Sequence, residues 1–437
     1  MSVLTFKGGV HPKDGKILSK TKAIQELLPT GEIVIPLSQH IGAPANPIVA
    51  VGDRVLVGQK IGEASGFISA NIHSSVSGTV KKIEPRLVTK GTNVMSVVIE
   101  NDNLYEEQAW DLKDYSEMTK EEKLEAIEEA GIVGMGGAGF PTNVKLSPKN
   151  PDEINYIIVN GAECEPYLTS DYRRMVEQPE VLIEGLKIIL SLFDNAKGII
   201  AVEDNKLDVI INLKKLTKKE DNIEIKAVYT KYPQGGERAL IYALTGRQVN
   251  SSMLPADVGC VVNNVDTVFA IYNALINHKP LISRIVTISG DDICEPGNFL
   301  VPIGTNVNEV IEAAGGFKKE PEKIICGGPM MGTAIFSTDI PVIKGTSAIL
   351  AFKKDDVARS EATSCINCGK CLSVCPGRVM PSRLADYAEH GDVESFVENY
   401  GMECCECGCC SYICPAKRNL TQSIKSMRGQ VLASRKK

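Results

Sequence analysis

The stretch CINCGKCLSVCP at residues 365–376 returns 39 residues later as CCECGCCSYICP at residues 404–415. Both copies carry the spacing C-x2-C-x2-C-x3-C followed by proline, so they form an internal duplication. Three thiolates at this spacing hold one [4Fe–4S] cube, and in two-cluster proteins the fourth cysteine binds the other cube. The duplication therefore predicts a small helical domain that carries two [4Fe–4S] clusters.

The bacterial ferredoxin pattern assigns eight cysteines to two clusters by exchange of the fourth ligand. One set is Cys365, Cys368, Cys371 and Cys414, and the other is Cys375, Cys404, Cys407 and Cys410. Structural zinc is the alternative, but zinc modules usually use two C-x2–4-C pairs. Cys405 and Cys409 fall outside the register and are interpreted as spare thiols. Two clusters that exchange a ligand lie close together, which is the arrangement of a one-electron conductor.

Composition limits the class of protein. The chain has 437 residues, of which 43% are hydrophobic and 23% charged, so several domains with packed cores are expected. A net charge of −6 and 5% aromatic residues disfavour binding to nucleic acid. Because no apolar run reaches the ~18 residues of a membrane helix, we expect a soluble, cytosolic chain. Ten of the 14 cysteines lie within 365–414, which in that compartment indicates metal.

A glycine-rich loop and alternating elements organise the middle of the chain. The loop GMGGAGFPT at residues 134–142 predicts a phosphate-binding loop, with a flexible connection as the alternative. Buried strands and amphipathic helices alternate after it, which predicts a parallel sheet with covering helices. The expected strands are 156–159, 197–202 and 223–229, and the expected helices are 179–193, 206–216, 235–244 and 265–278. Polar clusters at 160–166 and 234–237 follow strands, where ligands bind in such folds.

Two further domains flank this region. Short strands with glycine turns over residues 51–80 are similar to a biotinyl/lipoyl-type barrel sandwich, but the hairpin turn reads Ile72-His73-Ser74-Ser75 and has no modifiable lysine. We therefore expect a structural barrel without a swinging arm. A strand at 284–288 and a helix at 307–314 resemble a soluble-ligand-binding β-grasp (SLBB) domain. The predicted domains are residues 1–115 (barrel sandwich), 116–280 (Rossmann-like α/β), 281–350 (β-grasp) and 351–437 (two-cluster ferredoxin-like, with a basic tail).

The order of motifs carries a specific resemblance. G-x-G-G-A-G-F-P-T, N-x-x-E-x-E-P, Y-x-x-G-x-E and N-N-V-x-T follow one another from residue 134 to residue 267. In this region the chain resembles the FMN- and NADH-binding flavoprotein subunit of respiratory complex I. Over its full length it resembles the RnfC family, which belongs to the Rnf ion-translocating ferredoxin:NAD oxidoreductases.

The resemblance implies roles for particular residues. The residues expected to bind FMN and NAD(H) are Gly134, Gly136, Gly137, Gly139, Phe140, Lys145, Asn160, Glu163, Tyr232, Gly235, Asn263 and Asn264. Gly134, Gly136 and Gly137 would cradle the FMN phosphate with Lys145 beside it. Phe140 would stack on NADH. Glu165 and Glu237 are the implied catalytic residues near the nucleotide. The chain departs from complex I at Met135, Ala162 and Gly236, where the complex I protein has arginine, aspartate and glutamate.

The resemblance implies an electron-transfer subunit at the cytoplasmic face of the cell membrane. Its partners would be membrane-embedded subunits of an Rnf-type complex and an electron-carrier subunit with iron–sulfur clusters. One alternative is a cobalamin reductase of a bacterial microcompartment, and another is an iron–sulfur wiring module with a vestigial flavin site. Seven cations and no acid follow Cys414, either as local compensation for anionic clusters or as a docking surface for an acidic partner or an anionic membrane.

Overall fold

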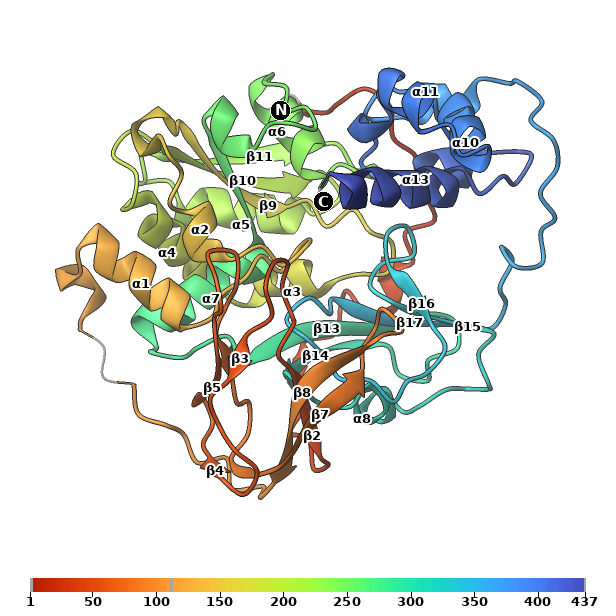
Figure 1. Ribbon diagram of the computed structural model, residues 1–437. Coiled ribbons are helices and arrows are strands. Elements are labelled where there is room, and N and C mark those ends of the chain that lie inside the picture. The colour runs from red at the N-terminus through yellow and green to blue at the C-terminus, as the bar shows by residue number, and fades with distance from the viewer. Residues whose placement is uncertain (1–2, 111–112, 436–437) are drawn as a thin grey trace.

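The computed structural model describes residues 3–110 and 113–435, and it is built from four packed parts (Figure 1). They are an antiparallel barrel, a parallel sheet covered by helices, a mixed sheet, and a helical part that holds the C-terminal cysteines. The multidomain α/β fold class predicted from the sequence is confirmed. Lys436 and Lys437 of the predicted basic tail lie outside the described residues. None of the described helices has the length and apolar character to cross a membrane.

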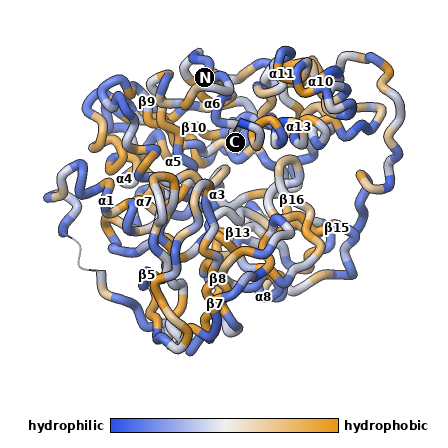
Figure 2. The backbone as a smooth tube through the Cα atoms, in the orientation of Figure 1, coloured by the Kyte–Doolittle hydropathy of each residue, from blue (hydrophilic) through white to orange (hydrophobic). Residues whose placement is uncertain are grey.

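The parallel sheet has the strand order β11-β10-β9-β12. Its strands are β9 (Tyr156–Gly161), β10 (Lys197–Glu203), β11 (Ile223–Val228) and β12 (Cys260–Asn264). Ile157 and Val159 of β9 belong to the core under helices α4 and α7, whereas Ile158 packs with α6 on the other face. Burial of both faces explains the continuous apolar strands that Figure 2 shows in β9 and β10.

Helices cover both faces of this sheet, as the alternation predicts. They are α1 (Lys120–Glu129), α2 (Thr142–Lys145), α3 (Ser170–Glu177), α4 (Pro179–Leu190), α5 (Leu207–Leu216), α6 (Glu237–Thr245) and α7 (Val265–Ile276). A capping box starts α1: Glu122 N donates to Thr119 Oγ1 at 3.2 Å, and Thr119 N donates to Glu122 Oε2 at 2.7 Å. Gly131 stops the helix with a φ of +64°.

The barrel packs two small antiparallel sheets around one apolar core. Their orders are β2-β8-β7-β4 and β3-β5-β6. The strands are β2 (Ile33–Pro36), β3 (Asn46–Pro47), β4 (Arg54–Val55), β5 (Lys60–Glu63), β6 (Ile72–His73), β7 (Gly78–Leu87) and β8 (Asn93–Asn101). The hairpin turn after β6 is buried: His73 packs 5.5 Å from Trp110, and Ser75 Oγ donates to Ile303 O at 2.5 Å. A buried turn fits a structural barrel.

The mixed sheet contains one strand from the N-terminal segment. Its order is β1-β14-β13-β17-β15-β16. The elements are β1 (Ile24–Glu26), β13 (Ser283–Ser289), β14 (Gly297–Pro302), α8 (Val307–Ala313), β15 (Lys323–Cys326), β16 (Thr333–Ile335) and β17 (Ala348–Phe352). Because β1 pairs in parallel with β14, the segment before residue 27 runs outside the barrel with which the prediction grouped it.

The helical part repeats its backbone with the 39-residue period of the sequence. Asn367, Gly369 and Arg378 have φ values of +53°, +70° and +56°, and their counterparts Glu406, Gly408 and Lys417 have +56°, +81° and +53°. The helices are α9 (Lys370–Val374), α10 (Pro381–Glu389), α11 (Val393–Glu398), α12 (Cys409–Ile413) and α13 (Leu420–Ser434). The segment between the two repeats forms two helices, α10 and α11, because Gly391 interrupts it with a φ of +71°.

Candidate functional site: a cysteine pocket beside a glycine-loop site

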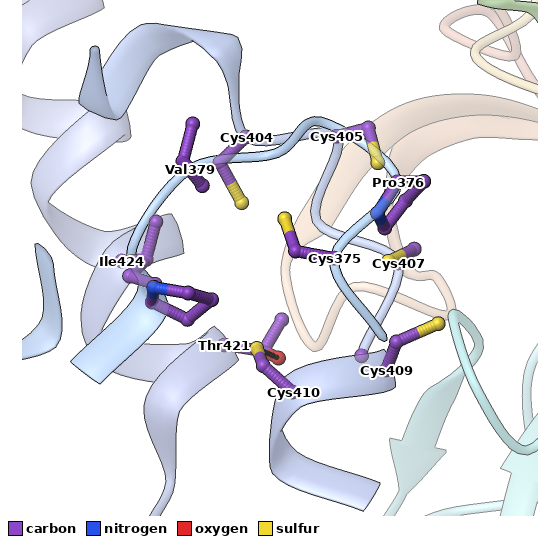
Figure 3. Close-up of a pocket in the computed structure, with 12 residues that line it drawn as sticks. Cys375, Pro376, Val379, Cys404, Cys405, Cys407, Cys409, Cys410, Thr421 and Ile424 are labelled. Atoms are coloured by element: carbon purple, nitrogen blue, oxygen red, sulfur yellow. Dashed lines mark hydrogen bonds between the residues drawn. The ribbon is translucent and has the colours of Figure 1, made fainter. Parts of the chain in front are cut away.

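A pocket in the helical part brings together the cysteines predicted to share one cluster (Figure 3). Cys404, Cys407 and Cys410 reach it from the second repeat, and Cys375 reaches it from the first. The fold thus places the fourth cysteine of one repeat among the three cysteines of the other. In Figure 3 the sulfur atoms of Cys375 and Cys404 point into the space between these chain segments.

The chemistry of this donor set fits an iron–sulfur cube. The pocket wall is otherwise mostly apolar and includes Val379 and Ile424. Burial raises the pKa of Cys404 to about 12, and it also raises the pKa values of Cys375 and Cys410. Thiols in such surroundings stay protonated unless a metal takes them as thiolates, which offsets the cost of the buried charge.

The two cysteines outside the register occupy the margin of the pocket. The side chain of Cys409 points away from the centre in Figure 3, and its Sγ donates to Tyr232 O at 3.8 Å. Cys405 is the more exposed of the two. Both line the pocket together with the predicted ligands, and their interpretation as spare thiols stays a prediction.

The other predicted cluster set lies nearer the surface. Cys365 and Cys368 are exposed, whereas Cys371 and Cys414 are half-buried against the same apolar core as the pocket cysteines. Thr363 N donates to Ala416 O at 2.9 Å, which holds the segment before Cys365 beside the one after Cys414. In residues 3–110 and 113–435, no three His, Cys, Asp or Glu side chains converge as a single metal ion requires.

The glycine loop is fixed at its base and open at its apex. Gly134 N donates to Phe140 O at 2.8 Å, and Met135 N donates to Thr267 Oγ1 at 3.1 Å. A Cβ on Gly136 would lie 2.9 Å from the Cβ of Asn264, so the loop packs against the end of β12. A Cβ on Gly137 would meet no atom within 4 Å, and both of these glycines lie at the surface end of the loop. The apex therefore has room for a phosphate to approach the backbone.

Lys145 and Glu237 lie together beside this loop. Lys145 is in the short helix α2 that follows the loop, and its Nζ donates to Val262 O at 2.8 Å. The same Nζ is 3.5 Å from Glu237 Oε1 at the start of α6. The half-exposed ion pair places one cation and one carboxylate near the carboxyl end of β12. Phe140, also half-buried, closes the glycine loop.

The residues after β9 are held by close backbone contacts. Asn160 Nδ2 donates to Gly235 O at 2.8 Å, and a Cβ on Gly235 would lie 2.2 Å from Ala162 O. Only glycine fits at that position. Gly235 N donates to Cys164 Sγ at 3.2 Å, and burial raises the pKa of this thiol to about 12. Burial and the raised pKa favour a packing role for Cys164 over a nucleophilic one.

Glu163 is buried opposite a lysine that sequence reasoning missed. Its Oε1 accepts from Asp171 N at 2.9 Å, and its Oε2 lies 3.7 Å from Lys16 Nζ. Lys16 Nζ also donates to Leu168 O at 2.5 Å and Glu165 O at 2.9 Å. No spacing signal could link residues 147 positions apart, because the N-terminal segment reaches the site only through the tertiary fold.

Asp171 is a second buried carboxylate that the motifs did not identify. Its Oδ2 accepts from Asn264 Nδ2 at 2.7 Å, and Asn264 Oδ1 accepts from Asp266 N at 2.9 Å to cap α7. Burial raises the pKa of Asp171, and the charges of Glu163 and Asp266 raise it further. Both amide atoms of Asn264 are thus used inside the protein, against the loop that carries Gly136.

Several buried polar atoms around these residues have no hydrogen-bond partner within the described part of the chain. They are Tyr232 OH, Gln234 Nε2 and Asn263 Nδ2, while Glu163 Oε2 has only its ion pair with Lys16. Leaving such a group unpaired costs ~1–3 kcal/mol. A ligand with several polar ring atoms would supply partners, so these residues fit a flavin at the carboxyl end of the sheet.

Two predicted residues lie at the junction with the cysteine pocket. The carboxylate of Glu165 accepts from Met330 N at 3.1 Å and Met331 N at 3.0 Å in the mixed-sheet part, and burial raises its pKa to about 7. Tyr232 packs in one apolar cluster with Cys407 and Cys409. The structure therefore joins the residues expected to bind the flavin to the cysteines through Tyr232, and it holds Glu165 within an interdomain contact.

Three domain families match separate parts of the chain, in agreement with the fold. The barrel sandwich hybrid domain of RnfC matches residues 4–104, the Nuo51 FMN-binding domain matches residues 127–273, and the SLBB domain matches residues 285–334. Among solved structures, an NAD+-reducing [NiFe]-hydrogenase in the air-oxidised state aligns with a TM-score of 0.51 at 22% identity. The alignment covers 62% of this chain and 53% of the hydrogenase chain, and it supports the fold alone.

Fold and site thus define an oxidoreductase subunit that joins an FMN-binding domain to a ferredoxin-like cysteine domain. The similarity to curated proteins is more specific. The C subunit of the Na+-translocating ferredoxin:NAD+ oxidoreductase complex of Acetobacterium woodii is 44% identical over 99% of this chain and 98% of the relative. The C subunit of the proton-translocating complex of Clostridium ljungdahlii is 45% identical over 98% and 94%. The chain belongs to this RnfC family of ion-translocating ferredoxin:NAD+ oxidoreductase subunits.

Proposed function

We propose that the chain is a peripheral subunit that exchanges hydride between NAD(H) and FMN and single electrons through two [4Fe–4S] clusters. It would act at the cytoplasmic face of a membrane-bound Rnf-type complex. The observation that carries the proposal is the shared apolar cluster of Tyr232, Cys164, Cys407 and Cys409, which joins the flavin residues to a four-cysteine pocket. In this proposal the electron donor site and the electron acceptor site share one packed contact.

Bound FMN would supply the conversion between hydride chemistry and one-electron chemistry. The chain's own residues bind and orient it. Gly136 and Gly137 leave the loop open to the phosphate, and Lys145 offers a cation next to it. Asn263 offers its buried amide nitrogen Nδ2, which has no hydrogen-bond partner in the described residues. Phe140 is assigned to stacking on the nicotinamide nucleotide.

The cluster set of Cys365, Cys368, Cys371 and Cys414 is assigned to the exit of electrons. Exposed apolar side chains lie close to these cysteines in sequence: Ile366 is 66% exposed, and Leu372 and Tyr412 are each 48% exposed. Exposed apolar side chains beside a redox site favour docking of a partner. We assign this face to an electron-carrier subunit with iron–sulfur clusters or to the membrane-embedded subunits.

The basic C-terminal tail is in part compensated within the chain. Arg418 Nη2 lies 2.6 Å from Glu389 Oε2, and Arg428 pairs with Glu406. Lys417, in contrast, is exposed and follows Cys414 by three residues. Lys425 Nζ also lies 3.8 Å from Glu406 Oε2. Ion pairs with Glu389 and Glu406 thus engage three of the cations, and the exposed Lys417 is left to contribute to the docking face.

NADH-dependent reduction of ferricyanide tests the flavin half of the proposal without requiring the clusters. The purified chain with added FMN should catalyse it, and the chain without FMN should not. Phe140→Ala should raise KM for NADH roughly 2- to 10-fold, because an aromatic stack contributes ~0.5–1.5 kcal/mol. Phe336→Ala is the matched control, since Phe336 is 80% exposed. Equal activity with and without FMN would contradict the proposal.

The two alternatives predict other results. The near full-length similarity to ferredoxin:NAD+ oxidoreductase subunits favours the proposed function over a cobalamin reductase. An iron–sulfur wiring module would bind iron and leave FMN unbound. The unpartnered buried polar atoms near Asn263 argue for a bound ligand.

A further inference from the structure

The N-terminal strap, defined here as residues 4–10, runs from the parallel sheet to the cysteine-bearing part. Figure 1 shows this red trace leaving the sheet and passing to the blue helices. Leu4 pairs in parallel beside the edge strand β11: Leu4 N donates to Ala227 O at 3.1 Å, and Tyr229 N donates to Leu4 O at 2.9 Å. The strap is therefore anchored at one end in the domain that carries the flavin residues.

The middle of the strap touches the backbone at a predicted cluster ligand. Gly9 N donates to Val374 O at 2.8 Å. A Cβ on Gly8 would lie 2.9 Å from Val374 O and 3.1 Å from Cys375 O, and Gly8 has a φ of +94°. Both the close approach and the left-handed backbone require glycine. Two main chains are thus in direct contact where Cys375 enters the pocket.

The far end of the strap pairs with the loop that carries Tyr232. Val10 N donates to Tyr232 O at 2.8 Å, and Tyr232 N donates to Val10 O at 2.9 Å. Val10 and Tyr232 pack in the same apolar cluster as Cys407 and Cys409. The strap consequently holds a flavin-site residue and both cysteine repeats at once.

Lys231 ties the strap down from the side of the sheet. Its Nζ donates to Phe6 O at 2.5 Å and to Gly8 O at 3.0 Å, and it lies 4.0 Å over the Phe6 ring. Partial burial lowers its pKa. The lysine therefore fixes the turn at Gly8 that meets Val374.

We propose that the strap sets the alignment of the flavin site with the nearer cluster, and that Gly8 and Lys231 are positioning residues for the electron transfer between them. Neither residue acts on the hydride step. The inference rests on the proposed function, because it concerns the path from flavin to cluster. Nothing in the motifs of the sequence identified this segment, whose residues act only by contact with distant parts of the chain.

The test follows the two steps separately in the full chain loaded anaerobically with FMN, iron and sulfide. Stopped-flow absorbance after mixing with NADH resolves flavin bleaching from cluster reduction, and iron analysis counts the clusters. Gly8→Ala is compared with Gly52→Ala, a control with the same backbone strain (φ +96°) and no neighbour within 4 Å of the added Cβ. Lys231→Met weakens the strap without a clash and covers the case in which Gly8→Ala fails to fold.

The proposal expects cluster reduction to slow severalfold in Gly8→Ala and Lys231→Met, because the rate of electron transfer falls exponentially with the separation of the two sites. Flavin bleaching and iron content should match the control. Cluster reduction as fast as in the control would overturn the proposal, and so would equal slowing of both steps, which would indicate damage to the flavin domain. If NADH does not bleach the flavin even in the unsubstituted chain, the proposed function itself fails.

Discussion

Replacing Lys344 by methionine removes a buried cation from the junction of three parts of the molecule. Lys344 lies between β16 and β17, and its side chain is fully buried. Its Nζ donates to Asn71 O of the barrel at 2.7 Å and to Gly131 O, just before the glycine loop, at 2.7 Å. Burial lowers the pKa of this ammonium from 10.5 to about 7.

The expected effect depends on pH in a defined direction. Above pH 7 the folded chain holds Lys344 neutral, whereas the unfolded chain keeps it protonated up to pH 10.5. The unfolded state therefore binds more protons in this window, and stability rises with pH by up to ~1.4 kcal/mol per pH unit. Below pH 7 both states are charged, so this dependence on pH is absent. Between pH 7 and pH 9 the rise amounts to at most ~3 kcal/mol.

Lys344→Met abolishes this slope, because methionine does not titrate. It also leaves the carbonyls of Asn71 and Gly131 without their donor, at ~1–3 kcal/mol each in every condition. The stability of the variant relative to the unsubstituted chain should thus fall by up to ~3 kcal/mol from pH 7 to pH 9, and this growing deficit is the quantity to measure.

Urea unfolding at pH 7, 8 and 9 measures the deficit, with Trp110 fluorescence as the probe. Trp110 is the single tryptophan, and it packs 5.5 Å from His73 in the barrel that Lys344 holds. Lys218→Met, at an exposed lysine, is the matched control and should show no such trend. A deficit that is constant across this range would refute the reasoning, because it would mean that Lys344 stays charged in the fold.

Three more predictions follow from single side chains. Glu165→Gln should be more stable than the unsubstituted chain by up to ~3 kcal/mol at pH 8, as measured by urea midpoints. Burial raises the pKa of Glu165 to about 7, so the unsubstituted chain loses stability as pH rises from 4.5 to 7. Cys409→Ser should retain all iron, whereas Cys375→Ser should lose about four irons by colorimetric assay, one cube. Gly137→Ala should change the free energy of unfolding by less than ~0.5 kcal/mol, because the added Cβ meets no atom within 4 Å. If the loop binds the FMN phosphate, the same substitution should lower FMN affinity about tenfold, as measured by fluorescence titration.

The spacing of cysteines and apolar residues predicted the parts of the fold that depend on local sequence. The cysteine duplication predicted two equivalent repeats, and the backbone repeats at the same period, down to Gly369 and Gly408. Continuous apolar runs predicted the buried strands, since a parallel sheet covered on both faces requires them. The polar clusters at 160–166 and 234–237 could be placed because each follows a predicted strand.

Contacts between distant segments were not predictable in this way. Lys16 meets Glu163, and Lys344 meets Gly131, across more than a hundred residues with no periodic signal. Asp171 was missed because a buried aspartate in the first turn of a helix looks like an ordinary helix-start residue. Strand β1 was missed because three residues are too few to show the alternation of apolar and polar side chains that predicts a strand.

Reduction of the clusters by NADH tests the central claim most directly. The full chain would be reconstituted anaerobically with iron and sulfide, with or without FMN, and mixed with NADH while visible absorbance and electron paramagnetic resonance are recorded. The account predicts flavin bleaching and reduced-cluster signals only when FMN is present. If the clusters assemble and dithionite reduces them, but NADH with FMN leaves them oxidised, electrons do not pass from nucleotide to cysteine pocket and the account is wrong.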